Sequence, residues 1–377
     1  MTTKRIRIVG IVILLLVWAA LATVAWLKPE TDTSDAERRQ LAHFPELNTE
    51  TLFDGSFMEA FETYTLDQFP LRDTFRRLKA LFHYNVFLQQ DNNDIYIADG
   101  YAAEMIPSVD DASVDHAIKQ FNMVYRLYLK DKNCKIYTTA VPDKGYYLAE
   151  ESGHLSMDYE ALFQKLETGM PWSKFVDITD QLSVEDYYRT DTHWRQEKLL
   201  PVAQKLASAM GVTTFGAEEL KTIALERPFY GVYYGQAALP MEPETMYVVK
   251  NDLLDQCVTA TTKWDASTKQ MVTVPRYTGV HDFEMLGSPD LYDVYLSGLE
   301  EPVVIENPNA KTDKTLVVFR DSFGSSLAPL LVQDYAKIIL VDIRAGSTRI
   351  NSLGFIDFTN ADVLFMYSTL VLNGGYI

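Results

Sequence analysis

Hydrophobic and polar positions along most of the chain follow a pattern that predicts strands separated by helices. Apolar runs of strand length lie at 95–97, 135–141, 174–178, 315–319, 337–342 and 362–367. Helical spacing marks residues 113–131 and 157–168, a stretch of about 16 residues after Trp194, and the segment between the strands at 315–319 and 337–342. Strands that alternate with helices predict an α/β fold in which helices cover both faces of a parallel sheet.

Residues 56–90 also show helical spacing, but with a strong aromatic content. One stripe contains Phe57, Phe61 and Tyr64, and a second stripe after Pro70 contains Leu71, Phe75, Leu78, Phe82 and Val86. Such stripes predict amphipathic helices that pack their apolar faces against the core. Residues 212–300 are instead rich in Tyr, Val and Thr with weak helical periodicity, which predicts an irregular, β-containing insertion in the same domain.

The N-terminus has the pattern of a membrane anchor. Lys4, Arg5 and Arg7 precede an uncharged run over residues 8–27, which is long enough to cross a bilayer core. Because the basic residues precede the run, the N-terminal tip is predicted in the cytoplasm and the remaining chain outside. A cleaved signal peptide is the competing interpretation, but its apolar region is usually only about 7–15 residues long. We therefore expect an uncleaved single-pass anchor.

These patterns divide the chain into three parts. Residues 1–28 are the predicted cytoplasmic tip and transmembrane anchor. Residues 29–55 are polar and are predicted to be a juxtamembrane linker. Residues 56–377 are predicted to form one catalytic domain, with the insertion at 212–300.

Composition limits the classes of partner. The formal net charge is -18, from 52 acidic and 34 basic residues, so the chain repels polyanions at long range and nucleic acid is not expected as a ligand. The same negative charge makes a strongly anionic polysaccharide a less expected substrate. There are only two cysteines, Cys134 and Cys257, which excludes a disulfide scaffold and a cysteine-rich metal site. We expect two unpaired, structural cysteines.

The first segment with candidate chemistry surrounds Ser322. An apolar strand runs into Arg320, Asp321 and Ser322, and an apolar helix follows. Ligands of open parallel sheets bind beyond the carboxyl ends of the strands, where a serine can expose its hydroxyl. Its backbone N–H would also point toward a developing oxyanion. The simpler interpretation is that Asp321 or Ser322 only caps the helix.

The second segment contains Asp191 and His193, two residues apart. In an extended segment, side chains at i and i+2 lie on one side of the chain, so the carboxylate can reach the imidazole Nδ1. The other ring nitrogen then remains free to take a proton from a serine. Alternatively, Asp191 or Thr192 caps the next helix, and His193 packs against Trp194. A metal site is not expected, because the six histidines form no pair with metal-ligand spacing.

Together the two segments resemble a known family. Asp191-Thr-His-Trp194 resembles the D-x-H-W signature of DHHW proteins and of the alginate O-acetyltransferase family, and Arg320-Asp-Ser-Phe-Gly324 resembles their nucleophile block, a variant of the SGNH-hydrolase motif. Residues 69–73, 141–144 and 330–344 are also similar to family motifs. The resemblance covers residues 44–377.

The resemblance implies an SGNH-hydrolase-like domain with Ser322 as nucleophile, His193 as general base and Asp191 as its orienting carboxylate. Along this chain the Asp–His pair would precede the serine, which is the reverse of the order in ordinary SGNH hydrolases. Triads are nevertheless defined by geometry rather than by chain order. Lys144 and Arg320 are candidates for substrate contact, or equally for ion-paired charges. No cofactor is implied.

Relatives in the family transfer or remove acetyl groups on polysaccharides outside the cytoplasmic membrane, commonly beside a membrane-bound O-acyltransferase. The resemblance therefore implies an extracytoplasmic O-acetyltransferase that acts on a cell-surface polysaccharide or exopolysaccharide. A carbohydrate acetylesterase would need the same triad. A non-catalytic glycan-binding or scaffold component of an assembly complex is the third interpretation.

Overall fold

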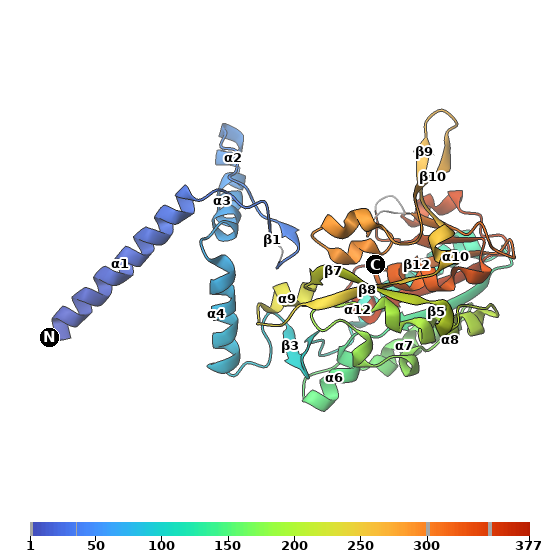
Figure 1. Ribbon diagram of the computed structural model, residues 1–377, viewed down its shortest axis with the longest axis horizontal. Helices are drawn as coiled ribbons and strands as arrows, with labels where there is room; N and C mark the ends of the chain where they lie inside the picture. Colours follow the sequence, from blue (N-terminus) through green and yellow to red (C-terminus); the bar gives the residue numbers. More distant parts are fainter. Residues whose placement is uncertain (1–2, 35, 299–301, 346–348) are drawn as a thin grey trace.

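A computed structural model describes residues 3–34, 36–298, 302–345 and 349–377, and its central feature is an eight-stranded sheet (Figure 1). Across the sheet the strand order is β10-β9-β11-β13-β12-β14-β5-β6. The bounds are β5 (Lys135–Val141), β6 (Lys174–Phe175), β9 (Val258–Asp265), β10 (Gln270–Thr278), β11 (Val303–Glu306), β12 (Thr315–Arg320), β13 (Lys337–Val341) and β14 (Asp362–Ser368). Strands β13, β12, β14, β5 and β6 run parallel, whereas β11, β9 and β10 form an antiparallel edge. The predicted α/β fold is confirmed.

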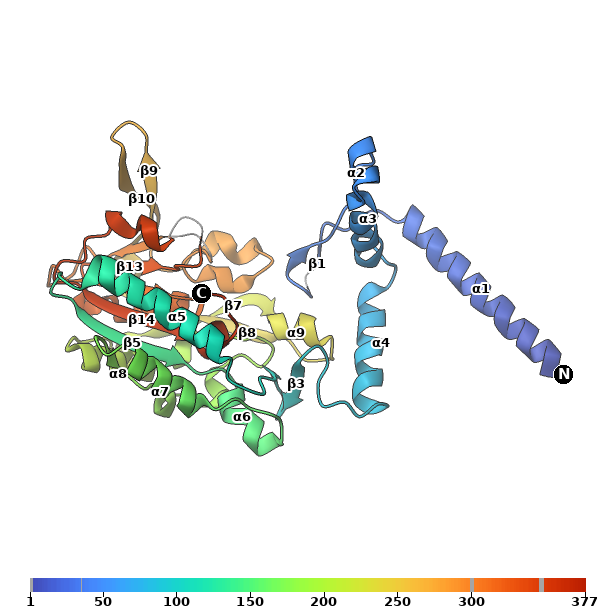
Figure 2. The ribbon, with the colours of Figure 1, turned by 180° about the vertical axis from the view of Figure 1, so that it is seen from behind.

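Helices cover both faces of the sheet because its central strands are apolar on both sides. Leu316 and Val318 of β12 pack with α8 (Leu200–Met210) and the 3-10 helix η8 (Ala328–Asp334). Val317 and Phe319 face the other way, toward α5 (Asp111–Val124) and α7 (Tyr159–Gly169). Figure 2 shows α5 lying across this second face. Continuous apolar strands of this kind are typical of parallel sheets with two covered faces.

Two details of the core differ from the predicted pattern. The helix expected after Trp194 is divided into a 3-10 turn, η4 (Gln196–Lys198), and α8, which has Pro201 in its first turn. Proline lacks a backbone N–H and favours a helix start at this position. The predicted strand at 174–178 is only the two residues of β6.

The predicted strand at 95–97 is present as β3 (Ile95–Ala98), but it lies outside the central sheet. It forms a two-stranded antiparallel pair with β4 (Tyr101–Glu104). The connecting residues Asp99 and Gly100 both have positive φ, at 48° and 81°, which closes a tight hairpin. The strand therefore pairs locally instead of extending the parallel sheet. Helix α6 (Gly145–Ser152), which follows β5, packs near this hairpin.

The segment at 212–300 is more regular than its sequence indicates. Strands β7 (Lys221–Phe229) and β8 (Glu244–Lys250) form a separate antiparallel pair, and α9 (Val232–Ala237) and α10 (Asp252–Gln256) accompany them. Strand β9 pairs with β11 on one side and with β10 on the other, so part of the segment extends the central sheet. The hairpin of β9 and β10 projects from the body in Figure 1.

The N-terminal part lies beside the α/β domain as a chain of helices (Figures 1 and 2). Helix α1 (Thr3–Leu27) is the one helix of the described residues that is long and apolar enough to cross a membrane, and it fits a single-pass anchor. It is followed by β1 (Thr33–Ser34), β2 (Arg39–Gln40), α2 (Thr49–Phe53), α3 (Ser56–Asp67) and α4 (Arg72–Asn85). Residues 29–55, predicted to be a linker, thus contain two strands and a helix. Residues 1–2, 35, 299–301 and 346–348 of the predicted segments lie outside the described residues.

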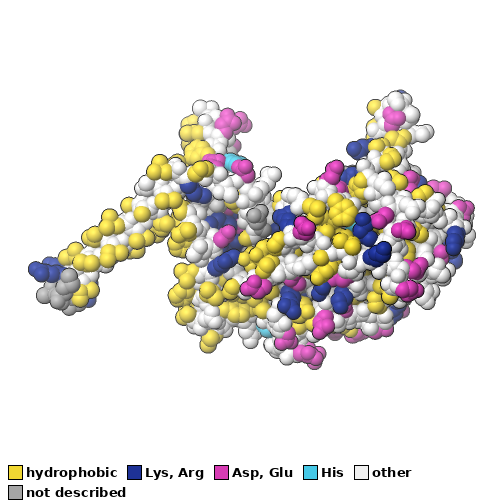
Figure 3. All heavy atoms as spheres, in the orientation of Figure 1, with side chains coloured by type: hydrophobic (Ala, Val, Ile, Leu, Met, Phe, Trp, Pro, Cys, Tyr) yellow, Lys and Arg dark blue, Asp and Glu magenta, His cyan; other side chains and the backbone are white. Residues whose placement is uncertain are grey.

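The predicted helices at 56–90 are confirmed as α3 and α4, but their apolar stripes are not buried alike. On α3, Phe57, Phe61 and Tyr64 pack around Phe44. On α4, the second stripe is exposed, and Figure 3 shows hydrophobic side chains along the edge of α3 and α4 that faces α1. The expectation that this second stripe faces the core is wrong, because the α/β domain contacts another face of α4, through Arg76 and Ala80.

Both cysteines are unpaired. The Cys134 thiol is half-buried and donates to the Phe358 carbonyl at 3.0 Å. Cys257 is buried, and burial raises the pKa of its thiol to about 12. Both are therefore structural side chains rather than reactive thiols.

Candidate active site

Ser322 stands at the end of β12, in the turn that leads into the short helix α11 (Phe323–Leu327). Asp321 fixes this turn, since one carboxylate oxygen accepts the Phe323 N–H at 3.1 Å and the other accepts the Ser368 N–H at 2.7 Å. A glycine is required at position 324 for steric reasons, because a Cβ there would lie only 2.7 Å from the Arg320 Cβ. The turn leaves Ser322 partly exposed between buried neighbours.

The segment with Asp191 and His193 is joined directly to the serine turn. Tyr187 and Trp194 form an isolated β-bridge, and the Tyr188 N–H donates to the His193 carbonyl at 3.0 Å. The buried Trp194 indole N–H is 3.1 Å from the Phe323 carbonyl and 2.9 Å from Ser326 Oγ. The tryptophan next to the histidine thus anchors this segment on α11.

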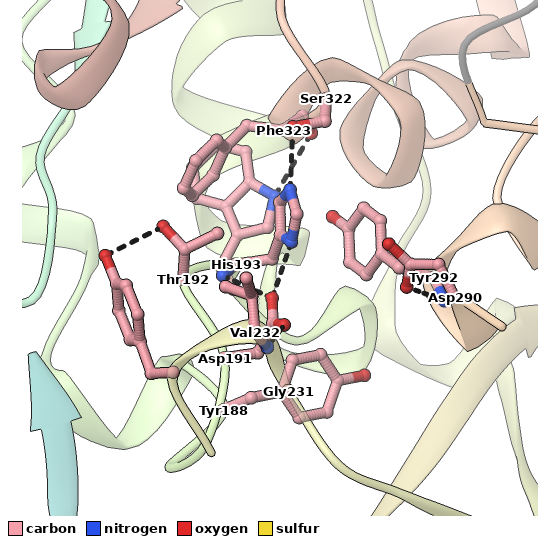
Figure 4. Close-up of polar contacts among 12 residues, drawn as sticks. Tyr188, Asp191, Thr192, His193, Gly231, Val232, Asp290, Tyr292, Ser322 and Phe323 are labelled. Carbon is pink, nitrogen blue, oxygen red and sulfur yellow. Dashed lines mark hydrogen bonds and ion pairs between the residues drawn. The ribbon is translucent and has the colours of Figure 1, made fainter. Parts of the chain in front are cut away.

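Asp191, His193 and Ser322 form one continuous hydrogen-bonded chain (Figure 4). The His193 ring joins Asp191 Oδ1 through Nδ1 at 2.6 Å and Ser322 Oγ through Nε2 at 2.7 Å. Asp191 Oδ1 also accepts the backbone N–H of His193 at 3.0 Å. The segment is therefore a bend closed by the aspartate rather than the extended stretch that we expected. Even so, the three predicted residues meet in triad geometry.

Two aromatic side chains contact the His193 ring. The ring of Tyr292 stacks on it with centroids 3.9 Å apart and planes 14° apart, and Phe323 lies at 4.9 Å in a tilted arrangement. The Tyr292 hydroxyl is in turn 2.8 Å from Ser326 Oγ. Figure 4 shows Tyr292 beside the imidazole. These contacts fix the ring plane along the line from aspartate to serine.

Asp191 is fully buried, and its second oxygen is satisfied from the N-terminal part and from the insertion. Oδ2 accepts the Val232 N–H at 2.8 Å and lies 3.2 Å from an Arg38 guanidinium nitrogen. Gly231 allows this approach, because a Cβ there would lie 2.2 Å from the Thr190 carbonyl oxygen. Burial alone would raise the pKa of Asp191, but the charges of Arg38 and His193 outweigh burial and hold that pKa well below its usual range.

Lys144 and Arg320, the two candidates for substrate contact, are both buried. The Lys144 ammonium donates to the carbonyls of Tyr188 at 2.9 Å and Arg189 at 3.2 Å. Burial lowers the pKa of Lys144 to about 7, although nearby carboxylates oppose this shift. Arg320 donates to the Asp321 carbonyl at 3.3 Å. Both therefore support the backbone of the triad segments, and their contact with a substrate stays a prediction.

Sequence reasoning missed Arg38, Val232 and Tyr292. None carries a local signal, because each comes from a segment far from the triad motifs in sequence. Among the residues that the structure describes, no group of three or more His, Cys, Asp or Glu side chains is arranged to hold a metal ion.

Comparison with family models finds no match, and comparison with curated proteins also finds none. Solved structures do match. A DHHW family protein from Eubacterium siraeum has 20% identity and a TM-score of 0.60, with 76% of this chain and 95% of that chain covered. Bacillus cereus PatB1, solved with a sulfonyl adduct, has 17% identity and a TM-score of 0.54, with 75% and 97% covered. The O-acetyltransferase domain of Pseudomonas putida AlgJ has 12% identity and a TM-score of 0.41, with 74% and 92% covered.

The region of similarity spans about three quarters of this chain and nearly all of each matched structure. At these identities the comparison concerns the fold. The expected resemblance to DHHW proteins is confirmed at that level, and the chain has the mostly parallel, helix-flanked α/β fold of a DHHW family protein and of PatB1.

Proposed function

We propose that this protein is a membrane-anchored O-acetyltransferase that modifies a cell-surface polysaccharide or exopolysaccharide through an acyl intermediate on Ser322. The observation that carries the proposal is the unbroken hydrogen-bonded chain from buried Asp191 through His193 to Ser322. A serine within reach of an imidazole that is itself oriented by a carboxylate is the arrangement that activates a hydroxyl for acyl transfer.

In the first half-reaction, Ser322 Oγ attacks the carbonyl carbon of the acetyl donor while His193 Nε2 takes the hydroxyl proton. The C–O bond to Oγ forms, and the carbonyl oxygen becomes an oxyanion, to which the Ser322 backbone N–H donates in this proposal. The tetrahedral species then collapses. The bond to the donor's leaving oxygen breaks, His193 returns its proton to that oxygen, and an acetyl ester remains on Ser322. Asp191 stabilises the imidazolium throughout.

In the second half-reaction, a sugar hydroxyl attacks the acetyl ester. His193 takes the proton of this hydroxyl, a second tetrahedral species forms, and the bond between the acetyl carbon and Oγ breaks. Ser322 Oγ then regains the proton from His193. The net result moves one acetyl group from the donor to the sugar. If water replaces the sugar hydroxyl, the same steps describe an acetylesterase.

The proposed site faces the extracytoplasmic side of the membrane. The apolar helix α1 and the basic residues before it support this orientation. We propose a membrane-bound O-acyltransferase as the partner that supplies the acetyl group, because acetyl donors such as acetyl thioesters are made in the cytoplasm and must be passed across the bilayer. The polysaccharide is the acceptor.

The first experiment tests the nucleophile. The full chain in lipid nanodiscs is incubated with a chromogenic acetyl ester, beside a variant with Ser322→Ala. We expect acetyl release from the unaltered chain and none above background from the variant. PatB1, which has the same fold, carries a sulfonyl adduct in its structure, so a sulfonyl fluoride is a suitable covalent probe of Ser322. Equal turnover by both chains would remove Ser322 from the mechanism.

The second experiment identifies the acceptor. The same preparation is incubated with the acetyl ester and neutral oligosaccharides, and the sugars are analysed by mass spectrometry. Acetylated sugar supports transfer, whereas free acetate as the sole product indicates an esterase. A chain that neither turns over the ester nor takes up the probe would be a non-catalytic glycan-binding or scaffold component.

A further inference from the structure

A basic side chain from the membrane-proximal hairpin reaches the catalytic carboxylate. Arg38 lies between β1 and β2, shortly after α1 ends at Leu27. Its guanidinium is 3.2 Å from Asp191 Oδ2 and 2.6 Å from Asp290 Oδ1. The Arg38 side chain is only 9% exposed. The segment that connects the membrane anchor to the enzyme therefore contributes a charge to the centre of the proposed site.

The hairpin is held firmly enough to place this charge. Glu37 pairs with Arg72 at 2.6 Å and with Arg76 at 3.3 Å on α4. Arg39 pairs with Asp67 at the end of α3, and this hydrogen bond is the main cause that lowers the pKa of Asp67 to about 2. Each neighbour of Arg38 in the chain is thus bound to a different helix.

The backbone around Arg38 is also shaped for this position. Arg38 has φ 51°, in the left-handed region that residues other than glycine seldom adopt. The hairpin approaches α9 so closely that a Cβ on Gly235 would lie 2.0 Å from the Ala36 carbonyl oxygen. An uncommon backbone conformation that is maintained by tight packing is often found where a side chain has a functional role.

The position of Arg38 has a direct consequence for the triad. Asp191 must be ionised and must keep Oδ1 toward His193, and Arg38 and the Val232 N–H together occupy Oδ2. Other charged groups around the pair are Asp290, which also binds Arg38, Lys144 at the start of α6, and Glu244 on β8. A buried carboxylate that lost its cationic partner would be strongly destabilised or would turn toward another donor.

We propose that Arg38 is a positioning residue for catalysis, through which the membrane-proximal hairpin holds Asp191 ionised and oriented toward His193. The inference rests on the proposed function, and it adds that the anchor segment completes the active site. Asp191 would hold His193 less well whenever the hairpin moved away from the catalytic domain.

The test compares Arg38→Gln with Arg39→Gln in the full chain in nanodiscs. Arg39 is the matched control, because it lies in the same hairpin and pairs with a buried carboxylate, Asp67, that does not touch the triad. The reporter is the NMR resonance of the His193 Nδ1–H, which depends on the hydrogen bond to Asp191 Oδ1. Loss of the Arg38 charge leaves Asp191 free to turn away or to take up a proton, so this resonance should shift in Arg38→Gln and keep its unaltered position in Arg39→Gln.

Turnover of the chromogenic ester is a separate readout. We expect Arg38→Gln to lower kcat on the order of 10-fold and to be rescued in part by Arg38→Lys. An unchanged His193 Nδ1–H resonance in Arg38→Gln, or the same shift in Arg39→Gln, would overturn the role of Arg38. Absence of turnover in every chain, with the NMR shift retained, would instead count against the proposed function alone.

A second, independent observation concerns the exposed apolar face of α4. One side of this helix contacts the β1–β2 hairpin and the α/β domain through residues spaced by four: Arg72 pairs with Glu37 of the hairpin, Arg76 donates to the Gly235 carbonyl at 2.6 Å, and Ala80 is fully buried. The other side consists of the outward residues Leu71, Phe75, Leu78, Leu81, Phe82 and Val86, which are between 39% and 66% exposed. An exposed apolar face of this extent marks an interaction surface.

The membrane anchor is attached beside this face. The Lys28 ammonium and the Thr31 N–H both donate to Gln68 Oε1, at 3.4 Å and 3.0 Å, just before α4 begins. At the last turn of α1, Trp26 contacts Phe44, which packs on α3. Tryptophan is enriched where a helix leaves the hydrocarbon core, so α3 and α4 start close to the membrane surface.

We infer that the outward face of α4 lies in the boundary between lipid headgroups and acyl chains of the leaflet from which α1 emerges. An amphipathic helix with an apolar face and basic flanks takes this position on membranes. Exposed Lys79 of α4 would then meet the anionic headgroups. Together with α1, this contact would hold the catalytic domain at a fixed height above the bilayer.

The test places a spin label at Leu78→Cys in the full chain in nanodiscs that contain phosphatidylglycerol, with Cys134→Ser to remove the half-buried thiol. Lys119→Cys, on exposed α5, is the matched control. We expect the Leu78 label to collide readily with oxygen and poorly with a water-soluble nickel complex, and the control to show the reverse. A Leu78 label as open to nickel as the control would overturn the inference. A label shielded from both reagents would also overturn it and would indicate a protein partner or a second copy.

Discussion

The central sheet and helix α4 have equally clear apolar patterns but opposite surroundings. In β12 and β14 every residue from Leu316 to Arg320 and from Asp362 to Ser368 is buried, because helices cover both faces. In α4 the residues of the apolar stripe are exposed, and the helix contacts the α/β domain through Arg76 and Ala80. Periodicity thus identifies an apolar face but does not identify what covers it.

The candidate active site joins the central sheet to the N-terminal part of the chain. The sheet supplies Ser322, and the bend at 186–195 supplies Asp191 and His193, but the hairpin of the N-terminal part supplies Arg38. Changes in the sheet should therefore affect both stability and activity. Changes in the N-terminal part should affect activity or membrane contact with little effect on folding.

The largest expected effect is on catalysis. Ser322→Ala and His193→Ala should each lower kcat by about 10³-fold or more, and the double variant should be no worse, because the two groups act as a unit. Ester turnover in nanodiscs measures this, with Ser325→Ala as the matched control from the same helix. Additive losses in the double variant would show that the serine and the histidine act independently.

A pair of truncations contrasts the two regions in stability. Leu364→Ala in β14 removes a fully buried side chain and should lower the free energy of unfolding by about 2–5 kcal/mol. Leu78→Ala on the exposed face of α4 should change it by no more than about 0.5 kcal/mol. Chemical denaturation of the full chain in detergent measures both. A large loss from Leu78→Ala would mean that its face is packed after all.

Gly231→Ala tests the close approach that supports Asp191. A Cβ would lie 2.2 Å from the Thr190 carbonyl oxygen, so the backbone must shift, at a cost of about 1–3 kcal/mol, and the Val232 N–H would move from Asp191. Activity should fall more than stability. The control is Gly287→Ala, where a Cβ meets no atom within 4 Å. Equal kcat/KM for the two variants would show that the close approach of Gly231 to Thr190 does not affect catalysis.

The last contrast concerns the pH dependence of stability. Burial lowers the pKa of His281 to about 3, from an ordinary value near 6.5. Between these values the unfolded chain binds the proton and the folded chain does not, so stability falls as the pH drops from 6.5 toward 3, by about 1.4 kcal/mol per pH unit. His281→Gln should flatten this slope in pH-dependent denaturation.

Exposed His43, in the N-terminal part, is the natural contrast to His281. Its hydrogen bond to Glu30 raises the pKa of the imidazole. The charged form is therefore favoured on folding, and any stabilisation is present at low pH and lost as the pH rises through the folded value. His43→Gln should change the profile slightly and in the opposite sense. The same sign for both variants would contradict the burial of His281.

The sequence indicated the parallel strands, the three residues of the Asp191–His193–Ser322 hydrogen-bonded chain and the apolar N-terminal helix, because each rests on a local pattern. Ser322 follows an apolar strand, and Asp191 and His193 lie two residues apart. Arg38, Val232 and Tyr292 could not be predicted, since their positions depend on tertiary contacts between distant segments. The place of β9 in the central sheet and the exposure of one face of α4 were missed for the same reason. Which strands pair, and which helix faces are buried, depends on the tertiary structure.

In the proposed mechanism, His193 activates Ser322 to accept an acyl group. The most direct measurement is intact-peptide mass spectrometry after rapid acid quench of the full chain with the acetyl ester, because acid preserves an ester on serine. We predict an added acetyl mass on the peptide that contains Ser322, and none when His193 is replaced by Ala. Acetyl found on another residue, or turnover without any acetyl on Ser322 at the earliest quench times, would contradict the account.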